Sequence, residues 1–100
     1  MEISTLQRIV IVDNDSETLD WLQRHLEAPS LEISTTQSAE EAIDLFRSND
    51  ADLLIAEFNC TPFDGLTLLK KVRLAKPNAM VILNGLATST NAVIEAMRLG

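Results

Sequence analysis

Short apolar runs alternate with amphipathic segments along the whole chain, and this alternation restricts the fold more than any other feature. Residues 8–13, RIVIVD, are nearly all apolar and rich in β-branched side chains, as expected of a strand covered on both faces. Residues 51–58 and 79–84 are similar, whereas residues 31–35 alternate apolar and polar side chains, which indicates a strand nearer a sheet edge. Four strands are therefore predicted.

An amphipathic helix is predicted after each strand. Leu19, Leu22 and Leu26 recur at helical spacing in the first, which Pro29 closes. The four helices are expected within residues 15–28, 38–49, 66–75 and 87–100. Four strand–helix units imply right-handed crossovers and a doubly wound parallel sheet with helices on both faces, an α/β fold.

Several polar residues fit the ends of these helices. Asp15 and Asp64 are candidate N-caps of the first and third helices, because a carboxylate there accepts hydrogen bonds from exposed backbone N–H groups. Ser38 and Glu41 have the spacing of a capping box. Pro77 ends the third helix, and Gly100 is a C-terminal stop for the fourth.

Residues 1–100 have the size of one domain, and 46% hydrophobic residues suffice for a core. A net charge of −7 argues against direct binding to nucleic acid or to an anionic membrane by this domain. Cys60 is the sole cysteine, so an internal disulfide is excluded and a cytoplasmic location is expected. No apolar run is long enough to span a bilayer.

Polar residues stand at the carboxyl ends of the predicted strands, where open parallel sheets bind ligands. The first strand ends in Asp13 and Asn14, the third in Glu57, and the fourth in Asn84 and Gly85. We expect these residues to lie at one edge of the sheet and to form the functional site.

These residues, in this order, resemble the receiver domain of two-component response regulators along essentially the whole chain. The resemblance rests on RIVIVDND (8–15), DLLIAE (52–57), TPFDG (61–65) and NAVIEAMRLG (91–100). It implies a flavodoxin-like sheet, of which this chain has four strand–helix units and lacks the fifth strand and helix. It also implies the N-terminal part of a longer bacterial regulator, and EAMRLG (95–100) resembles receivers attached to transcriptional activators.

The resemblance implies a set of roles that the residues here fill only in part. In the family, a strand-end aspartate accepts a phosphoryl group from a histidine kinase, and an acidic pair holds Mg²⁺. A hydroxyl after the fourth strand and a lysine after the fifth contact the phosphoryl group. Here Glu57 is at the phosphoacceptor position, Asn14 follows Asp13 in the metal pair, and Gly85 is at the hydroxyl position.

Each departure weakens phosphotransfer for a physical reason. The extra methylene of Glu57 moves the carboxylate by about 1.5 Å, and displacements of about 1 Å cost about a hundredfold in rate. Asn14 removes a formal charge from a hard-cation site, so Mg²⁺ is expected to bind weakly or not at all. Gly85 has no hydroxyl to read a phosphoryl group. Asp64 and Gly65 complete the loop after Glu57.

The sequence therefore predicts a regulatory module that is not an enzyme and acts through protein–protein contact without phosphorylation. Its expected partners are a second copy, an output domain or a histidine kinase. The alternative is a working Mg²⁺-dependent phosphoacceptor in which Asp13, Asn14 and Glu57 or Asp64 take part. A small-molecule sensor that reuses the pocket is a third hypothesis. Glycines only at 65, 85 and 100 exclude a Gly-rich phosphate loop.

Other residues receive simpler interpretations. His25 is predicted to be solvent-exposed, Cys60 to be inert, and Trp21 to lie over its neighbours or mark an interface. The basic cluster of the third helix is either a solvated face or a docking surface for an acidic partner; it comprises Lys70, Lys71, Arg73 and Lys76. Without a fifth strand, the fourth would be an unpaired edge through which chains could associate.

Overall fold

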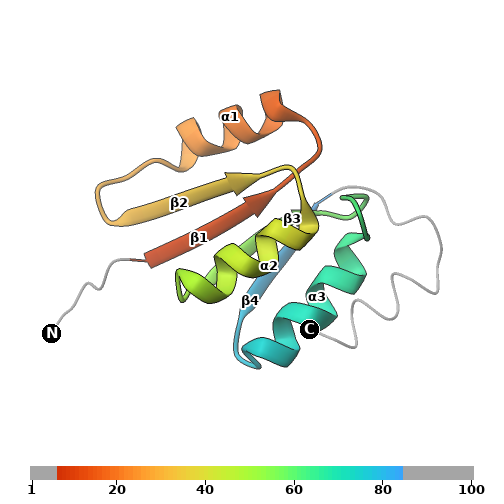
Figure 1. Cartoon of the computed structure of the whole chain (residues 1–100). Coiled ribbons are helices and arrows are strands. Elements are labelled where there is room, and N and C mark those ends of the chain that lie inside the picture. Colours follow the sequence, from red (N-terminus) through yellow and green to blue (C-terminus); the bar gives the residue numbers. More distant parts are fainter. Residues whose placement is uncertain (1–6, 85–100) are drawn as a thin grey trace, which may run out of the picture.

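The computed structural model describes residues 7–84, and these form a parallel four-stranded sheet with helices on both faces (Figure 1). The strands are β1 (Gln7–Val12), β2 (Leu31–Thr36), β3 (Leu53–Glu57) and β4 (Met80–Asn84). The helices are α1 (Ser16–Leu26), α2 (Ala39–Ser48) and α3 (Gly65–Ala75). The fourth helix expected from the sequence and its Gly100 stop lie outside the described residues.

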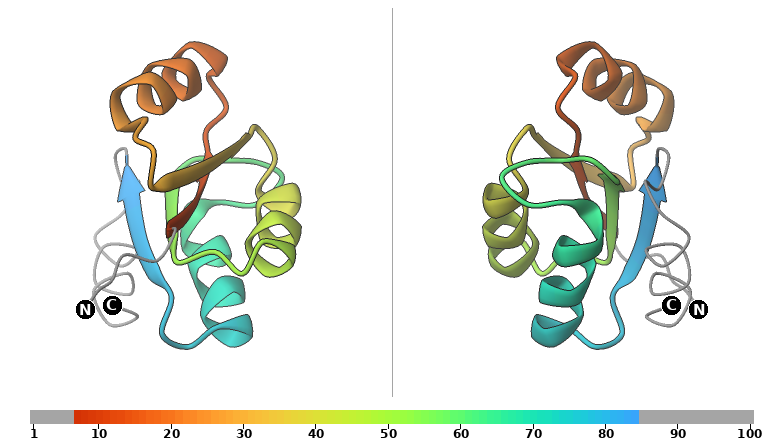
Figure 2. Two further views of the ribbon diagram at one scale, coloured as in Figure 1. Left: turned by 90° about the vertical axis from the view of Figure 1, so that its left-hand side faces the viewer. Right: turned by 90° about the vertical axis from the view of Figure 1, so that its right-hand side faces the viewer.

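The strand order is β2-β1-β3-β4, with every pair parallel, so the predicted doubly wound α/β fold is confirmed. β2 lies at an edge, as its alternating pattern predicted, and β4 is the other outer strand of the described sheet. β1 and β3 lie in the centre. Helix α1 covers one face, and α2 and α3 lie side by side on the other (Figure 2).

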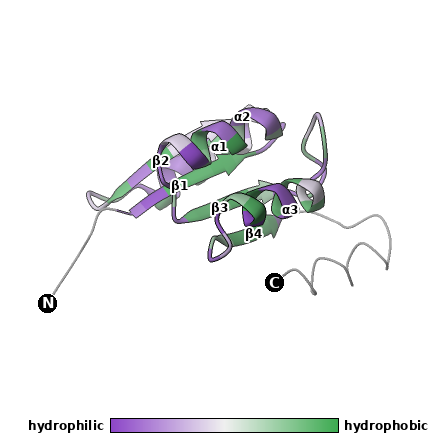
Figure 3. Cartoon of the chain, turned by 60° about the horizontal axis from the view of Figure 1, so that its bottom comes forward, coloured by the Kyte–Doolittle hydropathy of each residue, from purple (hydrophilic) through white to green (hydrophobic). Residues whose placement is uncertain are grey.

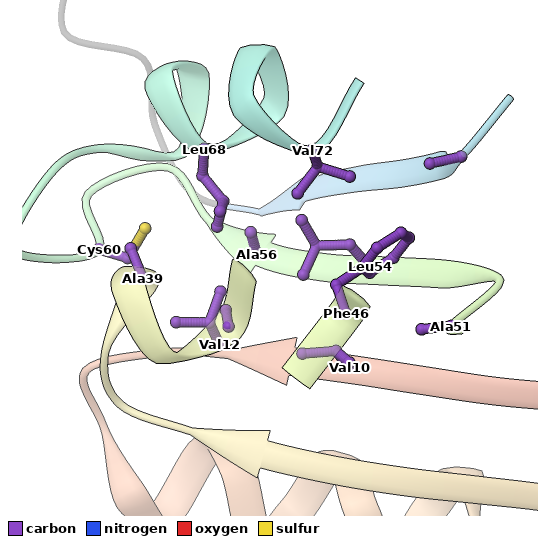
Figure 4. Close-up of a cluster of buried hydrophobic side chains, with 12 residues drawn as sticks. Val10, Val12, Ala39, Phe46, Ala51, Leu54, Ala56, Cys60, Leu68 and Val72 are labelled. Carbon is purple, nitrogen blue, oxygen red and sulfur yellow. The ribbon is translucent and has the colours of Figure 1, made fainter. Parts of the chain in front are cut away.

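The larger core lies between the sheet and helices α2 and α3 (Figure 4). Val10, Val12, Leu54 and Ala56 alternate along β1 and β3 to reach it, and the α2 residue Phe46 packs against them. The alternate positions of the same strands point to α1. There Ile9, Ile11 and Ile55 meet Leu19, and Leu22 and Leu26 pack at the margin, so the predicted leucine stripe of α1 is confirmed.

Hydropathy follows this layering. β3 and β4 are coloured as hydrophobic in Figure 3, and hydrophilic residues lie on the helices. This pattern is expected of parallel strands covered by helices, and β3 is mostly buried, whereas β4 alternates exposed and half-buried residues in the described part. Four large apolar side chains are nevertheless exposed among the described residues: Trp21 (53%), Leu74 (85%), Met80 (66%) and Ile82 (47%). No helix of the described part is both long and apolar enough to cross a membrane.

The predicted N-caps within residues 7–84 are all present, whereas the predicted capping box of α2 is only half formed. Asp15, Ser38 and Asp64 each accept a backbone hydrogen bond at the start of a helix. The capping box was wrong in its second half. The Glu41 carboxylate accepts a hydrogen bond from the Thr36 hydroxyl, which in turn accepts one from the Ser38 N–H. The Ser38 backbone N–H therefore donates to Thr36 rather than to Glu41, the acceptor that the capping box predicts.

Replacing Leu54 by alanine should test the contribution of the larger core. Leu54 is 0% exposed, so Leu54→Ala should lower the free energy of unfolding by about 2–5 kcal/mol through lost burial and a residual cavity. The matched control is Leu74→Ala, which removes the same atoms from an exposed position and should change stability by less than about 0.5 kcal/mol. Urea unfolding followed by circular dichroism measures both, and equal losses would contradict this account of the core.

Candidate functional site

The sheet register brings the predicted site residues to one edge. Val12 of β1 pairs with Ala56 of β3, so Asp13 and Glu57 follow on adjacent strands. Glu57 in turn pairs with Asn84 at the end of β4. The predicted convergence of the strand ends is therefore present for these residues, whereas Gly85 lies outside the described part of the chain.

Asp13 is the most buried carboxylate of this edge, with 8% of its surface exposed. Its Oδ1 accepts a hydrogen bond of 2.9 Å from the Asp15 backbone N–H, and its own N–H donates to the Thr36 carbonyl at 3.2 Å. Asp15 is turned toward α1, where it caps the helix at the Glu17 N–H. The two aspartates thus have separate roles: Asp13 faces the strand ends, and Asp15 begins the helix.

Glu57 reaches across to the segment that follows β1. Its Oε2 accepts a hydrogen bond of 3.2 Å from the backbone N–H of Asn14. The Glu57 carboxylate is therefore engaged with the neighbouring strand end within the chain itself.

The Asn14 side chain connects the end of β1 to the loop between β3 and α3. Its Nδ2 donates to the Asn59 carbonyl at 3.0 Å, and its Oδ1 accepts from the Thr61 hydroxyl at 3.2 Å. We call these two contacts the Asn14 bridge. Sequence reasoning assigned Asn14 to a metal pair and missed Asn59 and Thr61.

The same loop is also attached to α2 and packs closely against β3. The Thr61 carbonyl accepts a hydrogen bond of 2.7 Å from the Ala39 N–H. Gly65 lies so close to β3 that a Cβ there would be 2.9 Å from the Glu57 carbonyl oxygen and 3.0 Å from the Phe58 Cα. A side chain at residue 65 would require the backbone to move. Asp64 accepts from the Thr67 N–H at 2.9 Å and is the N-cap that was predicted.

Cys60 lies inside this loop and is 3% exposed. Burial, and secondarily the negative charges of Glu57, Asp64 and Asp13, raise the pKa of the Cys60 thiol to about 11. The Sγ donates a hydrogen bond to the Phe63 carbonyl at 3.4 Å. A buried thiol whose ionisation is suppressed is a weak nucleophile.

The family implies Mg²⁺ at this edge, and the donors present are a poor fit to it. One oxygen of Asp13, one of Glu57 and the amide oxygen of Asn14 each accept a hydrogen bond from the chain. Mg²⁺ requires near-octahedral oxygen geometry, usually with carboxylates. Within residues 7–84, no group of three or more His, Cys, Asp or Glu side chains is placed to hold a metal ion.

His25, Trp21 and Lys76 lie outside the site, and each contacts a neighbouring part of the chain. His25 is exposed, as predicted; its ring stacks on Trp21 with 4.0 Å between centroids, and its Nδ1 lies 2.8 Å from the Trp21 carbonyl. Trp21 lies over this neighbour. In the basic cluster, the Lys76 Nζ donates to the Ala51 carbonyl at 2.7 Å.

The chain matches a known protein family. The family described as response regulator receiver domain matches residues 9–100. The cell cycle transcriptional regulator CtrA of Caulobacter vibrioides is 30% identical over 79 residues, which are 78% of this chain and 34% of that protein. CtrA of Brucella ovis is 30% identical over 81 residues, 80% of this chain and 35% of that protein. The chain thus spans about a third of the length of these curated relatives.

Solved structures give the same result for the fold. A response regulator receiver domain protein from Clostridium thermocellum has a TM-score of 0.85 at 25% identity, over 95% of this chain and 77% of that one. A CheY-like receiver domain protein from Methanospirillum hungatei has a TM-score of 0.87 at 24% identity, over 96% of this chain and 77% of that one.

A double-mutant cycle should measure the Asn14 bridge. Asn14→Ala and Thr61→Val should each destabilise the fold, and the double variant should lose less than the sum by about 0.5–1.5 kcal/mol, because the two side chains share a hydrogen bond. Urea unfolding gives the four free energies. The control pairs Asn14→Ala with Thr35→Val in β2, where additive losses are expected. Additivity in both cycles would show that the bridge contributes no coupling energy.

The raised pKa of Cys60 predicts a loss of stability at alkaline pH. The thiol ionises at an ordinary pKa of 9.0 when the chain is unfolded and at about 11 when it is folded. The folded state therefore holds the proton more tightly, and its advantage is complete below pH 9 and lost as pH rises through 11. Between these values, stability should fall by up to about 1.4 kcal/mol per pH unit.

Cys60→Ala is the control for this pH dependence, because lysine titration affects both proteins equally. Urea unfolding at pH 8, 9 and 10 should show a smaller decline for Cys60→Ala than for the wild type. Parallel declines would show that the thiol ionises equally well in the folded protein.

Proposed function

The chain belongs to the response regulator receiver domain family of two-component signalling, and we propose that it is a degenerate receiver that works without phosphorylation. It acts in the cytoplasm as a regulatory module of a longer transcription regulator, through contact with protein partners. Those partners are an output domain, a second copy or a histidine kinase. The proposal assigns no catalytic residue to the chain and no direct contact with nucleic acid or membrane.

The hydrogen bonds of Asn14 carry this proposal. Phosphoryl transfer depends on positioning and on neutralisation of the developing charge, chiefly by metal ions. Asn14 would have to give up the Thr61 hydroxyl, or share its amide oxygen, to serve a cation. Its backbone N–H is already bound to Glu57. A weak Mg²⁺ site or none is therefore proposed, and the residues at this edge hold one another instead.

Glu57 supports the same conclusion from the acceptor side. An attacking carboxylate must lie in line with the phosphoryl donor, and a hydrogen bond of 3.2 Å to Asn14 directs one Glu57 oxygen toward β1. The Glu57 carboxylate is a permanent part of the chain, unlike a phosphoryl group, which comes and goes. We propose that this fixed carboxylate holds the module in one signalling state.

A phosphorylation assay and an NMR titration should test the proposal together. With Mg²⁺ and acetyl phosphate, mass spectrometry of the intact protein should show no added phosphoryl group. Amide spectra with millimolar Mg²⁺, alone and with beryllofluoride, should show no saturable shift at Asp13, Asn14 or Glu57. The positive control is the triple variant Asn14→Asp, Glu57→Asp, Gly85→Thr, which restores the family pattern and should gain Mg²⁺-dependent shifts.

Stoichiometric labelling of the wild type would overturn the proposal. If that labelling were lost in Glu57→Gln, the chain would be a working phosphoacceptor that uses glutamate. If it persisted in Glu57→Gln and were lost in Asp64→Asn, the acceptor would be Asp64.

A further inference from the structure

Positive charge is concentrated in one stretch of this acidic chain. Residues 65–84 contain four basic side chains and no acidic one, a net charge of +4. Since the whole chain has a net charge of −7, the remaining residues carry −11. The four basic residues all belong to α3 and its C-terminal cap, and they are Lys70, Lys71, Arg73 and Lys76.

Two of these residues have a clear role within the fold. Lys76 is directed inward, where its Nζ contacts the Ala51 carbonyl and lies 3.5 Å from the Asp50 carboxylate. Arg73 is in the last turn of α3, where positive charge favours the C-terminal end of the helix dipole. Lys71 precedes the last turn and is exposed; its Nζ lies 5.4 Å from the centre of the Phe63 ring.

Leu74 lies three residues after Lys71 and therefore on the same side of the helix. It is 85% exposed, the most exposed large apolar side chain of the described residues. An isolated exposed leucine needs no explanation. Leu74, however, lies beside an exposed lysine and directly before Ala75, which lines a surface hollow.

The hollow has a volume of about 220 Å³ and is lined by residues at the C-terminal ends of α2 and α3. The hollow combines apolar side chains with charges of both signs, and the Lys76 Nζ within it lies 3.5 Å from the Asp50 carboxylate. Its lining residues are Phe46, Arg47, Asp50, Ala75 and Lys76. The acidic residues of α2's first turn, Glu40 and Glu41, lie at the opposite end of that helix.

We propose that Lys71, Leu74 and the adjacent hollow form a docking surface for an acidic amphipathic helix of a partner protein. The inference rests on the proposed function, because a receiver without phosphotransfer must communicate by contact. A leucine or similar side chain of the partner packs on Leu74 and enters the hollow, and its carboxylates face Lys71 and Arg47. The net charge of −11 on the rest of the chain repels the same partner elsewhere, which confines binding to this surface.

The probe for this surface is a fluorescein-labelled helical peptide of alanine, leucine and glutamate, with leucines on one face. Fluorescence anisotropy at low salt should show saturable binding to the full chain, weakened at least tenfold in 0.5 M salt because exposed charges are screened. Amide spectra should place the shifts in α3 and at the end of α2. A matched peptide with lysine in place of glutamate should not bind.

Variants identify the residues responsible. Lys71→Glu and Leu74→Ser should each raise the dissociation constant at least fivefold. The matched controls on α1 are Arg24→Glu, which makes the same change of charge, and Trp21→Ser, which removes another exposed apolar side chain; both should leave binding unchanged. Circular dichroism verifies that each variant is folded.

The proposal would be overturned by no peptide binding at low salt, by equal weakening from Arg24→Glu and Lys71→Glu, or by peptide-induced shifts centred on α1. A dimer that Lys71→Glu dissociates, without peptide binding, would also overturn it and assign the surface to a second copy. These outcomes are separate from phosphorylation. If the protein is not phosphorylated and the peptide does not bind, only the docking surface is refuted. If the protein is phosphorylated and the peptide still binds, only the proposed function is refuted.

Discussion

Burial of the two central strands on both faces is the constraint on which the rest of the structure depends. Ile11 of β1 and Leu54 of β3 are each 0% exposed, yet they point to opposite faces of the sheet. Such strands are stable only between two layers of helices, and parallel pairing with helical crossovers provides those layers. Parallel pairing also brings all the strand ends to the same edge. The polar site at that edge is thus a consequence of how the apolar side chains are buried.

This constraint explains why the sequence predicted so much of the fold. Runs such as 8–13 are recognisable locally, and the N-caps Asp15, Ser38 and Asp64 lie next to the N–H groups they bind. The proximity of Asp13 and Glu57 follows from the topology alone, because both residues end central strands. None of these predictions requires knowledge of a side chain's orientation.

The capping box was predicted wrongly and the Asn14 bridge was missed, because in each case a side chain has more than one possible polar partner. The partners of Asn14 are 45 and 47 residues away, and an asparagine in isolation fits a metal ligand as well as a structural bridge. Glu41 has the spacing of a capping box, but the Thr36 hydroxyl lies between it and the Ser38 N–H. Spacing in the sequence identifies what a side chain can reach, and the fold decides which partner it binds.

Asn14 and Glu57, the two departures from the receiver pattern at this edge, are hydrogen-bonded to each other, which neither departure reveals when it is considered alone. The side chain of an aspartate at residue 14 would have no N–H to donate to the Asn59 carbonyl, and its charge would stand near Asp13 and Glu57. Carboxylates at such an edge repel one another unless a cation lies between them. A neutral amide at residue 14 lowers that repulsion, and the longer side chain of Glu57 reaches the N–H of the same residue. The hydrogen bond between Asn14 and Glu57 therefore joins the two strand ends within the chain itself.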